Sequence, residues 1–380
     1  MSKKIIFAAS NYWNSPYQVG SHHYAKMFAK NGWDVLFISD PISPFHFLKK
    51  NRSQLRERFK IYKGQAQSEF ENIKTYVPMA LVTPNEKSFF NTEFVTKNWF
   101  KMTMPNLINY IKKANFGDVD ILWFDSILQA PLIDEIKHKK SILRIADKIE
   151  SFKKISQNLK NQGEILKEKV DIIVYAAKSL EDYVKKYKNK IHYVPNGVDI
   201  NHFINSSKNM PDDLKNIPKP IAIYIGAIDD WFGLDFLYKV AMQCKDISFV
   251  LIGDPIIDIS KLNKLSNFYF LGRKNYNLIP QYLNNSEAGI ITFDVNHPVV
   301  DTVNPIKLYE YMACGLPVVS TSWKELELIN SPAFLAKSSE EFSKVLYGAL
   351  ESGKDQKYLD FAKENSWDKR FEEIIRIYNN

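Results

Sequence analysis

The sequence has few cysteines and no long apolar run, and each absence excludes a class of protein. Two cysteines, Cys244 and Cys314, are too few for a disulfide framework. They also lie far apart and lack the spacing of zinc ligands. We expect both to be reduced core thiols. No stretch approaches the roughly 20 apolar residues that a membrane-spanning helix needs. The apolar run at residues 5–9 is too short for a signal peptide, so a cytoplasmic protein is expected.

The chain also lacks a recognisable nucleic-acid-binding motif, although one half is strongly basic. Residues 1–195 hold 32 Lys and Arg against 19 Asp and Glu, whereas residues 196–380 hold 19 against 24. This asymmetry indicates a negatively charged partner for the first half, which leaves open a membrane surface, an anionic substrate or a nucleic acid. Because the sequence has no recognisable nucleic-acid-binding motif, a nucleic-acid partner is disfavoured.

One basic segment favours the membrane. Residues 45–63 interleave Phe and Leu with seven cations, the pattern of an interfacial helix on an anionic bilayer. The cations are Lys49, Lys50, Arg52, Arg56, Arg58, Lys60 and Lys63. The aromatic stretch 89–116, which begins with Phe89, either extends this surface or, as its helical spacing favours, packs in the core. We therefore expect peripheral attachment to the inner face of the cell membrane.

Periodicity and length predict two α/β domains, because 380 residues exceed one ordinary core. In the first half, strands are predicted at 4–9, 35–39, 119–124, 141–146, 171–175 and 192–194, with a helix over 21–30 and a helical run of about ten residues after 124. In the second half they are predicted at 221–225, 247–252, 267–271, 288–292, 317–320 and 333–335. Helices between strands predict two doubly wound parallel sheets. We expect domains at 1–195 and 196–355, and a C-terminal helix at 356–380 that packs back across the junction.

Ligands in such sheets bind beyond the carboxyl ends of the strands. The loop 11–20 and the following helix should therefore present Tyr17, Gly20, His22 and His23 to a cleft, unless these rings pack under the loop. The two histidines do not suit one metal ion, because neighbours on a helix point apart. Asp147 directly follows strand 141–146 and is the predicted catalytic carboxylate; the alternative is that it caps the next helix.

The stretch 304–320 carries the second candidate site. Asn304 is predicted to cap a helix that begins with Pro305 and ends at Gly315. Lys307 and Glu310 then share one face, which places a cation at the positive helix end, where it suits a bound phosphate. A carboxylate one turn later can accept hydrogen bonds from ribose hydroxyls. The alternative is an ordinary surface ion pair.

The chain resembles the GT-B glycosyltransferases. The resemblance rests on the two predicted sheets, the junction Pro195–Asp199 and the segment Lys307–Val319. The resemblance implies two Rossmann-like domains facing across a cleft, with the acceptor on the first and a nucleotide-sugar on the second. It implies no essential metal or cofactor. By position, Lys307 would contact the diphosphate, Glu310 the ribose, Arg273 and Lys274 the base. The loop that holds Gly226 and Ile228 would contact the phosphates, beside Asn304.

Two departures from the family pattern favour inversion at the anomeric carbon. Thr302 stands where many retaining members have a second glutamate, and the loop 228–232 lacks their basic residues. The sequence is also similar to the GumK-type glucuronosyltransferases of bacterial exopolysaccharide synthesis, whose strand-end Arg-Ala-Ser-Asp would fall on Arg144–Asp147. The resemblance thus predicts transfer from a UDP-sugar, with UDP-glucuronate as one candidate, to a glycan or lipid-linked glycan. The rivals are a UDP-sugar epimerase on the same fold and a nucleic-acid-binding protein.

Overall fold

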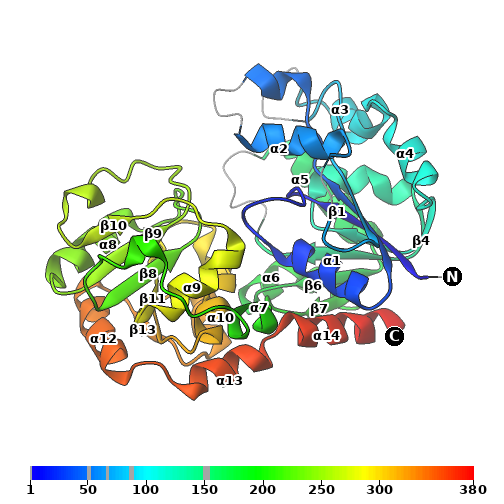
Figure 1. The fold of residues 1–380 in the computed structure, drawn as a ribbon. Helices are drawn as coiled ribbons and strands as arrows, with labels where there is room; N and C mark the ends of the chain where they lie inside the picture. The colour runs from blue at the N-terminus through cyan, green and yellow to red at the C-terminus, as the bar shows by residue number, and fades with distance from the viewer. Residues whose placement is uncertain (1, 49–52, 66–67, 85–89, 149–154) are drawn as a thin grey trace. The chain divides into compact units, whose positions relative to one another are not determined.

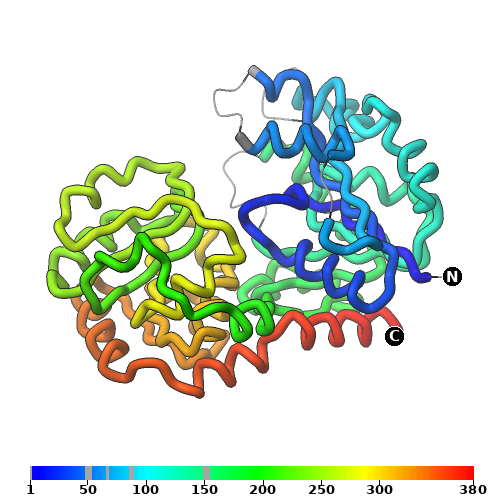
Figure 2. Tube along the Cα trace, viewed as in Figure 1, coloured from blue at the N-terminus to red at the C-terminus, as the bar shows by residue number. Residues whose placement is uncertain are grey.

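The computed structural model describes residues 2–48, 53–65, 68–84, 90–148 and 155–380. The chain divides into two compact units (Figure 1). Unit 1 comprises Met1–Ala176, Leu180–Val194 and Phe371–Asn380, and unit 2 comprises Ala177–Ser179 and Pro195–Arg370. Figure 2 follows the backbone from the blue end in unit 1, through unit 2, to the red end that belongs to unit 1 again.

Unit 1 is built on a seven-stranded parallel sheet with the order β3-β2-β1-β4-β5-β6-β7. Its strands are β1 (Lys4–Ala9), β2 (Asp34–Ser39), β3 (Ile73–Tyr76), β4 (Asp118–Phe124), β5 (Lys137–Ile145), β6 (Ile172–Tyr175) and β7 (Ile191–Tyr193). Its helices are α1 (Gly20–Lys30), α2 (Ser53–Tyr62), α3 (Glu93–Asn98), α4 (Leu107–Lys113), α5 (Gln157–Lys169) and α6 (Glu181–Val184). The strand order reverses between β1 and β4, which is where open α/β sheets bind ligands.

Unit 2 is built on a six-stranded parallel sheet with the order β10-β9-β8-β11-β12-β13. Its strands are β8 (Ile221–Ile225), β9 (Ser248–Ile252), β10 (Phe268–Phe270), β11 (Ala288–Ile291), β12 (Val318–Thr321) and β13 (Phe334–Ala336). Its helices are α7 (Ile200–Ile204), α8 (Leu234–Gln243), α9 (Ile279–Asn284), α10 (Ile306–Ala313), α11 (Lys324–Ile329), α12 (Ser339–Ser352) and α13 (Gln356–Glu364). The predicted architecture of two doubly wound sheets is confirmed.

The last helix, α14 (Trp367–Asn379), links the units, because its residues from Phe371 onward belong to unit 1. The ring of Phe371 packs edge-on against Phe28 of α1, with ring centroids 5.0 Å apart. At the other end of unit 2, Val198 donates its N–H to the Asn365 carbonyl (3.1 Å) and accepts the Trp367 N–H (3.0 Å). The first and last segments of unit 2 are therefore hydrogen-bonded to each other.

Two local predictions were wrong, and one strand was missed. The helical run after residue 124 is a 3-10 helix over Ile127–Asp134, because Pro131 cannot donate the hydrogen bond that an α-helix requires. The strand β3 was missed because its four residues, Ile73–Tyr76, form neither an apolar run nor a regular alternation. The closing segment forms two helices rather than one, because the helix is interrupted at residues 365–366, where Ser366 makes a β-bridge with Val198.

The two cysteines are free, as predicted, with Cys244 buried and Cys314 half-buried. Within the described residues, no helix is both long enough and apolar enough to cross a membrane.

Candidate functional site

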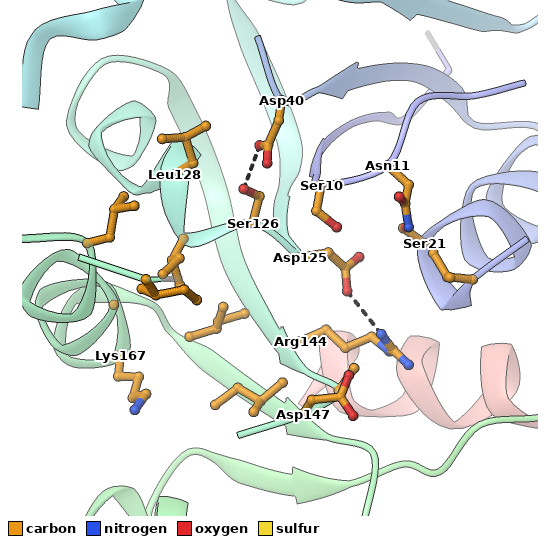
Figure 3. A pocket seen from close by; sticks show the side chains of 18 of the residues that line it. Ser10, Asn11, Ser21, Asp40, Asp125, Ser126, Leu128, Arg144, Asp147 and Lys167 are labelled. Atoms are coloured by element: carbon orange, nitrogen blue, oxygen red, sulfur yellow. Dashed lines mark hydrogen bonds and ion pairs between the residues drawn. The ribbon is translucent and has the colours of Figure 1, made fainter. Parts of the chain in front are cut away.

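A cavity of about 490 Å³ lies at the carboxyl edge of the unit 1 sheet, where the strand order reverses (Figure 3). Polar side chains line it directly after four strands: Ser10 and Asn11 after β1, Asp40 after β2, Asp125 and Ser126 after β4, and Asp147 after β5. Parallel strands end at one edge, so residues far apart in sequence meet here. The rest of the lining is largely aliphatic.

Asp147 faces this cavity from the end of β5, close to the Arg144 guanidinium (Figure 3). Burial raises the pKa of the Asp147 carboxyl to about 6, and the positive charge of Arg144 opposes that rise. Within the part of the chain that the structure describes, no hydrogen bond occupies the carboxylate. Asp147 does not cap α5, because Ser156 does so by accepting the Leu159 N–H at 3.3 Å. The carboxylate is therefore available to accept a proton from a ligand.

Arg144 is held from two sides. Its Nη1 donates to Oδ1 of Asp125 at 3.1 Å, in an ion pair whose side chains are only 4% and 8% exposed. The other oxygen of Asp125 accepts the indole N–H of Trp123 at 2.8 Å. Gly20, the first residue of α1, lies against the guanidinium, and a Cβ there would fall 2.6 Å from Arg144 Cζ. Gly20 is thus needed for close packing against Arg144.

Asp40 is a second carboxylate of the cavity, and the sequence analysis missed it. Its Oδ1 accepts hydrogen bonds from Ser126 Oγ (2.6 Å) and Gln129 Nε2 (3.3 Å). Burial raises the pKa of Asp40 to about 6 against these hydrogen bonds and the nearby Arg58. Asp40 and Asp125 both directly follow a buried strand, which is the signal that identified Asp147 and could have identified them.

The predicted cleft residues of the first loop lie elsewhere. His22 is fully buried between Trp13 and Phe37, with Nε2 3.0 Å from the Tyr12 carbonyl oxygen, and burial lowers its pKa to about 4. His23 is buried as well, so the expectation that these rings face a cleft is corrected: they complete the core under the loop. Tyr17 is half-buried and, like Gly20 and both histidines, is not among the residues that line the cavity.

In unit 2, the predicted donor residues Lys307, Glu310 and Gly226 come together near the end of β8. The Lys307 ammonium lies 3.9 Å from the Tyr224 ring centroid and 4.8 Å from that of Phe293. Burial lowers the pKa of Lys307 to about 7, and the Glu310 carboxylate opposes this. A buried amine without a carboxylate in contact can ionise fully when an anion reaches it.

Glu310 has a partner that the sequence analysis missed. Tyr276 donates its hydroxyl hydrogen to Glu310 Oε1 at 3.1 Å, and its ring stacks on His202, with centroids 4.5 Å apart. Burial raises the pKa of Glu310 to about 7, opposed by the Tyr276 hydrogen bond and by Lys307. The carboxylate is therefore held in one orientation. Tyr276 follows β10 by six residues, so periodicity gave no signal for it.

Gly226 ends β8 with φ of +149°, and a Cβ there would lie 2.7 Å from Lys307 Nζ. Only glycine allows both this backbone conformation and the approach of the ammonium. Ile228 is fully buried, and its N–H donates to the Asp254 carbonyl at 3.3 Å. Its side chain is thus part of the core.

The two basic residues after β10 each pair with an acid. Arg273 Nη1 lies 3.3 Å from Asp254 Oδ2, with half of the side chain exposed. Lys274 Nζ lies 2.6 Å from Asp213 Oδ2.

Asn304 does not cap α10, which corrects the prediction. The N-cap residue is Pro305 and the helix begins at Ile306. The Asn304 side chain is buried, where its amide donates to Glu325 Oε1 at 3.0 Å and its oxygen accepts the Tyr309 hydroxyl at 3.0 Å. These bonds hold the loop before α10. The N-cap residue, Pro305, makes no side-chain capping hydrogen bond.

Within the described residues, no group of three or more His, Cys, Asp or Glu side chains has the arrangement of a metal site.

Two family models match successive parts of the chain. Residues 7–176 match the N-terminal domain of the glucuronosyltransferase GumK, and residues 219–352 match the group 1 glycosyltransferases. The first match contains the unit 1 cavity and the second contains Lys307 and Glu310.

A curated protein of Bacillus subtilis (strain 168), named provisionally as the teichuronic acid biosynthesis glycosyltransferase TuaH, is 26% identical over 164 residues. The match covers 42% of this chain and 41% of that protein, so the aligned part spans about two fifths of the relative's length.

Solved structures resemble the whole chain. Sucrose-phosphate synthase from Thermosynechococcus elongatus superposes with a TM-score of 0.71 at 13% identity, covering 99% of this chain and 98% of that one. Anabaena HepE in complex with UDP and glucose superposes with a TM-score of 0.66 at 14% identity over 100% of both chains. At this identity the likeness shows the fold, which is GT-B.

Proposed function

We propose that this chain, a GumK-like glycosyltransferase with the GT-B fold, transfers a sugar from a UDP-sugar to a hydroxyl of a glycan or lipid-linked glycan in surface polysaccharide synthesis, with inversion. The family matches and the HepE complex with UDP support the donor class. The TuaH match supports the polysaccharide setting. One observation carries the mechanism: the Asp147 carboxylate lines a ligand-sized cavity and has no hydrogen-bond partner among the described residues.

In the proposed reaction, Asp147 accepts the proton of the acceptor hydroxyl while that oxygen attacks the anomeric carbon opposite the leaving UDP. A carboxylate can act as this base because the hydroxyl becomes acidic as the new bond forms to an oxocarbenium-like centre. The Lys307 ammonium and the N-terminus of α10 stabilise the charge that develops on the leaving diphosphate. Glu310, oriented by Tyr276, accepts hydrogen bonds from the ribose hydroxyls.

This arrangement assigns the leaving-group charge to the protein, so we propose that transfer needs no metal ion. Arg273 and Lys274 lie on the loop assigned to the base, and Gly226 and Ile228 on the loop assigned to the phosphates. Turnover that persists in EDTA would support this assignment.

The basic surface of unit 1 supports peripheral attachment to an anionic membrane. Arg56, Lys60 and Lys63 are exposed on or just after α2, and the Lys63 ammonium lies over the Phe59 ring. Phe45, Phe94 and Met104 are large apolar side chains that are 48%, 68% and 68% exposed. Lys49, Lys50, Arg52 and Phe89 lie outside the described residues. A lipid-linked acceptor would reach the enzyme at such a surface.

The test is the Asp147→Asn variant. We expect transfer to fall by about 10²–10⁴-fold, the usual contribution of a general base, while UDP affinity stays within twofold of wild type. Transfer is measured with radiolabelled UDP-sugars and bacterial lipid-linked glycans, and the anomeric configuration of the product by NMR. The control is Asp118→Asn, an exposed carboxylate at the opposite end of β4. Substantial turnover by Asp147→Asn, or retention of configuration, would remove Asp147 as the base of an inverting reaction.

A further inference from the structure

The described lining of the unit 1 cavity has an excess of negative charge. Among the residues that the structure describes, three carboxylates line it, from Asp40, Asp125 and Asp147, and two cations, from Arg144 and Lys167. In Figure 3, Asp125, Arg144 and Asp147 lie close together, Asp40 points toward Ser126, and Lys167 lies apart from this group on α5. A ligand that enters the cavity therefore meets more acid than base.

Both cations are already paired. Arg144 contacts Asp125 at 3.1 Å. Lys167 is 2% exposed, its ammonium lies 2.6 Å from Glu164 Oε1, and it stacks over the Tyr183 ring at 3.7 Å. Arg58, which is near Asp40 but is not a lining residue, donates through Nη2 to the backbone carbonyls of Asp40 and Pro41. Within the described lining, a ligand anion would have to break one of these pairs to gain a cation.

The two carboxylates left for a ligand are Asp40 and Asp147. Asp40 Oδ1 is fixed by Ser126 and Gln129, whereas no hydrogen bond among the described residues occupies Oδ2. Asp147 has no hydrogen-bond partner among them either. Carboxylates with ordinary or moderately raised pKa values are largely ionised at pH 7, and ionised carboxylates only accept hydrogen bonds.

Most of the remaining described lining is aliphatic and includes Val19, Leu128, Leu143, Ile155 and Leu159. Four neutral polar side chains, Ser10, Asn11, Ser21 and Ser126, complete that described lining. Aliphatic walls with a few fixed acceptors suit a molecule that has C–H faces and several hydroxyl donors, which describes a sugar ring. A uronate or phosphate group in the same place would lie beside like charges in a partly desolvated site, at a large cost.

We propose that this cavity binds an uncharged, hydroxyl-rich sugar ring of the acceptor, and that Asp40 is the residue that selects it by accepting hydrogen bonds from its hydroxyls and repelling acidic sugars. This inference rests on the proposed function, because it names the acceptor class for the site of Asp147. Whatever charge the donor sugar carries, the ring that receives it is neutral.

The alternative role of Asp40 is structural, since it ties Ser126 and Gln129 to the end of β2. A structural role predicts that its loss weakens all ligands equally. Selection by charge predicts that its loss changes the ratio between neutral and acidic ligands. The ratio is therefore the quantity to measure.

The first experiment uses the full chain with UDP present. Phenyl glycosides of glucose, galactose and mannose, each with its uronic acid counterpart, are titrated at pH 7 by saturation-transfer NMR. We expect at least one neutral glycoside to bind, and its acidic counterpart to bind at least tenfold more weakly. Equal or tighter binding of the acidic counterpart, or binding by none of the three neutral glycosides, would overturn the proposal.

The second experiment compares three variants with wild type. Asp40→Asn should weaken the neutral glycoside about tenfold and reduce the penalty on the acidic one at least threefold. Leu159→Lys, which adds a cation to the lining without touching Asp40, should favour the acidic glycoside. Asp118→Asn, outside the cavity, should leave both constants unchanged. If both Asp40→Asn and Leu159→Lys keep the wild-type ratio of neutral to acidic glycoside affinity, selection by charge is overturned. If Asp40→Asn fails to fold, the ratio measured for Leu159→Lys decides alone.

Failure of this inference is distinguishable from failure of the proposed function. A chain that binds UDP and transfers sugar to an acidic acceptor keeps the function and loses the inference. A chain that neither binds UDP nor turns over any UDP-sugar loses the function itself.

Discussion

At the scale of single residues, the proposed roles of Lys307 and Glu310 make donor binding depend on pH. In the free protein, burial places the pKa of both groups near 7, lowering that of the lysine and raising that of the glutamic acid. A diphosphate beside Lys307 favours the ammonium, so binding takes up a proton above pH 7. Hydroxyls beside Glu310 favour the carboxylate, so binding releases a proton below pH 7.

We therefore predict that UDP binds most tightly near pH 7 and that its affinity falls on either side, by up to tenfold per pH unit. Isothermal titration calorimetry from pH 6 to 9, in buffers of different ionisation enthalpy, measures both the affinity and the protons exchanged. Lys307→Met should remove the alkaline dependence and weaken UDP about 10- to 100-fold, and Glu310→Gln should remove the acid dependence. A wild-type affinity that is flat over this range contradicts the assignment.

The sequence predicted Asp147 and Lys307 because each follows a local rule: a carboxylate after a buried strand, and a cation at the start of a helix. It did not predict Asp40 or Tyr276. Asp40 satisfies the same rule as Asp147, but which strand ends lie beside it depends on the sheet order, and Tyr276 lies six residues past β10, where no local rule applies. His22 and His23 show the converse, because residues next to a ligand-binding loop in sequence can complete the core below it.

At the scale of single elements, the first residue of α1, Gly20, packs against the Arg144 side chain of β5. Gly20 leaves room for the Arg144 guanidinium, and the buried pair with Asp125 prevents that side chain from moving aside. We predict that Gly20→Ala lowers the free energy of unfolding by about 1–3 kcal/mol through overpacking, and lowers transfer activity as well. Urea denaturation and a transfer assay measure the two effects.

The matched control is Gly348→Ala in the middle of α12, where an added Cβ meets nothing within 4 Å. This variant should be as stable as wild type or up to about 1 kcal/mol more stable, because alanine restricts the unfolded chain. Gly20→Ala with wild-type stability and activity would show that Arg144 is not confined.

The helix α2 carries the proposed membrane contact. Each basic residue near an anionic bilayer contributes about 1 kcal/mol, so Arg56→Gln with Lys60→Gln and Lys63→Gln should weaken binding to phosphatidylglycerol-containing liposomes by at least tenfold. Cosedimentation measures the bound fraction at low and physiological salt.

A second triple variant, Lys112→Gln with Lys113→Gln and Lys137→Gln, removes the same charge from α4 and the amino end of β5. It should retain binding. If both triple variants bind as wild type does, the membrane contact is not made by α2.

Helices and strands were predicted correctly where the pattern of apolar residues in the sequence was clear and uninterrupted. Apart from β3, the buried strands of both sheets contain such apolar runs, and helices between them were expected from the alternation of strands and helices. The 3-10 helix at Ile127–Asp134 and the cap of α10 did not follow, because Pro131 and the buried contacts of Asn304 override the local preference for a regular helix.

At the scale of the whole molecule, unit 1 depends on the far end of the chain. Phe371, Ile374 and Ile377 are buried, and Phe371 packs on Phe28. We predict that deleting residues 371–380 lowers the stability of unit 1 by more than about 3 kcal/mol, since each lost side chain contributes about 1.5–3 kcal/mol of burial. Differential scanning calorimetry with and without UDP identifies which unit melts earlier.

The control for this truncation is Glu372→Ala with Arg376→Ala, which changes exposed residues of the same helix. It should melt as wild type does. A truncated chain that melts at the wild-type temperature would show that unit 1 is complete without these residues.

The GT-B architecture was the most predictable property of the molecule, because it follows from two runs of alternating strands and helices separated by one turn. The part that α14 plays was predicted only as a helix returning to the junction. That its last residues complete the core of unit 1 depends on Phe28, which lies more than 300 positions earlier in the sequence.

The bonds that Val198 makes to Asn365 and Trp367 have a further consequence. Because the two ends of the segment 195–370 meet, this segment, which is unit 2 apart from residues 177–179, can be exchanged as one piece without changing the path of the rest of the chain. Under the proposed function, in which unit 2 binds the donor and unit 1 the acceptor, nucleotide-sugar preference and acceptor preference can then diverge independently in evolution. The same seam offers the protein engineer a site for exchanging one donor specificity for another while Asp40 and Asp147 stay as they are.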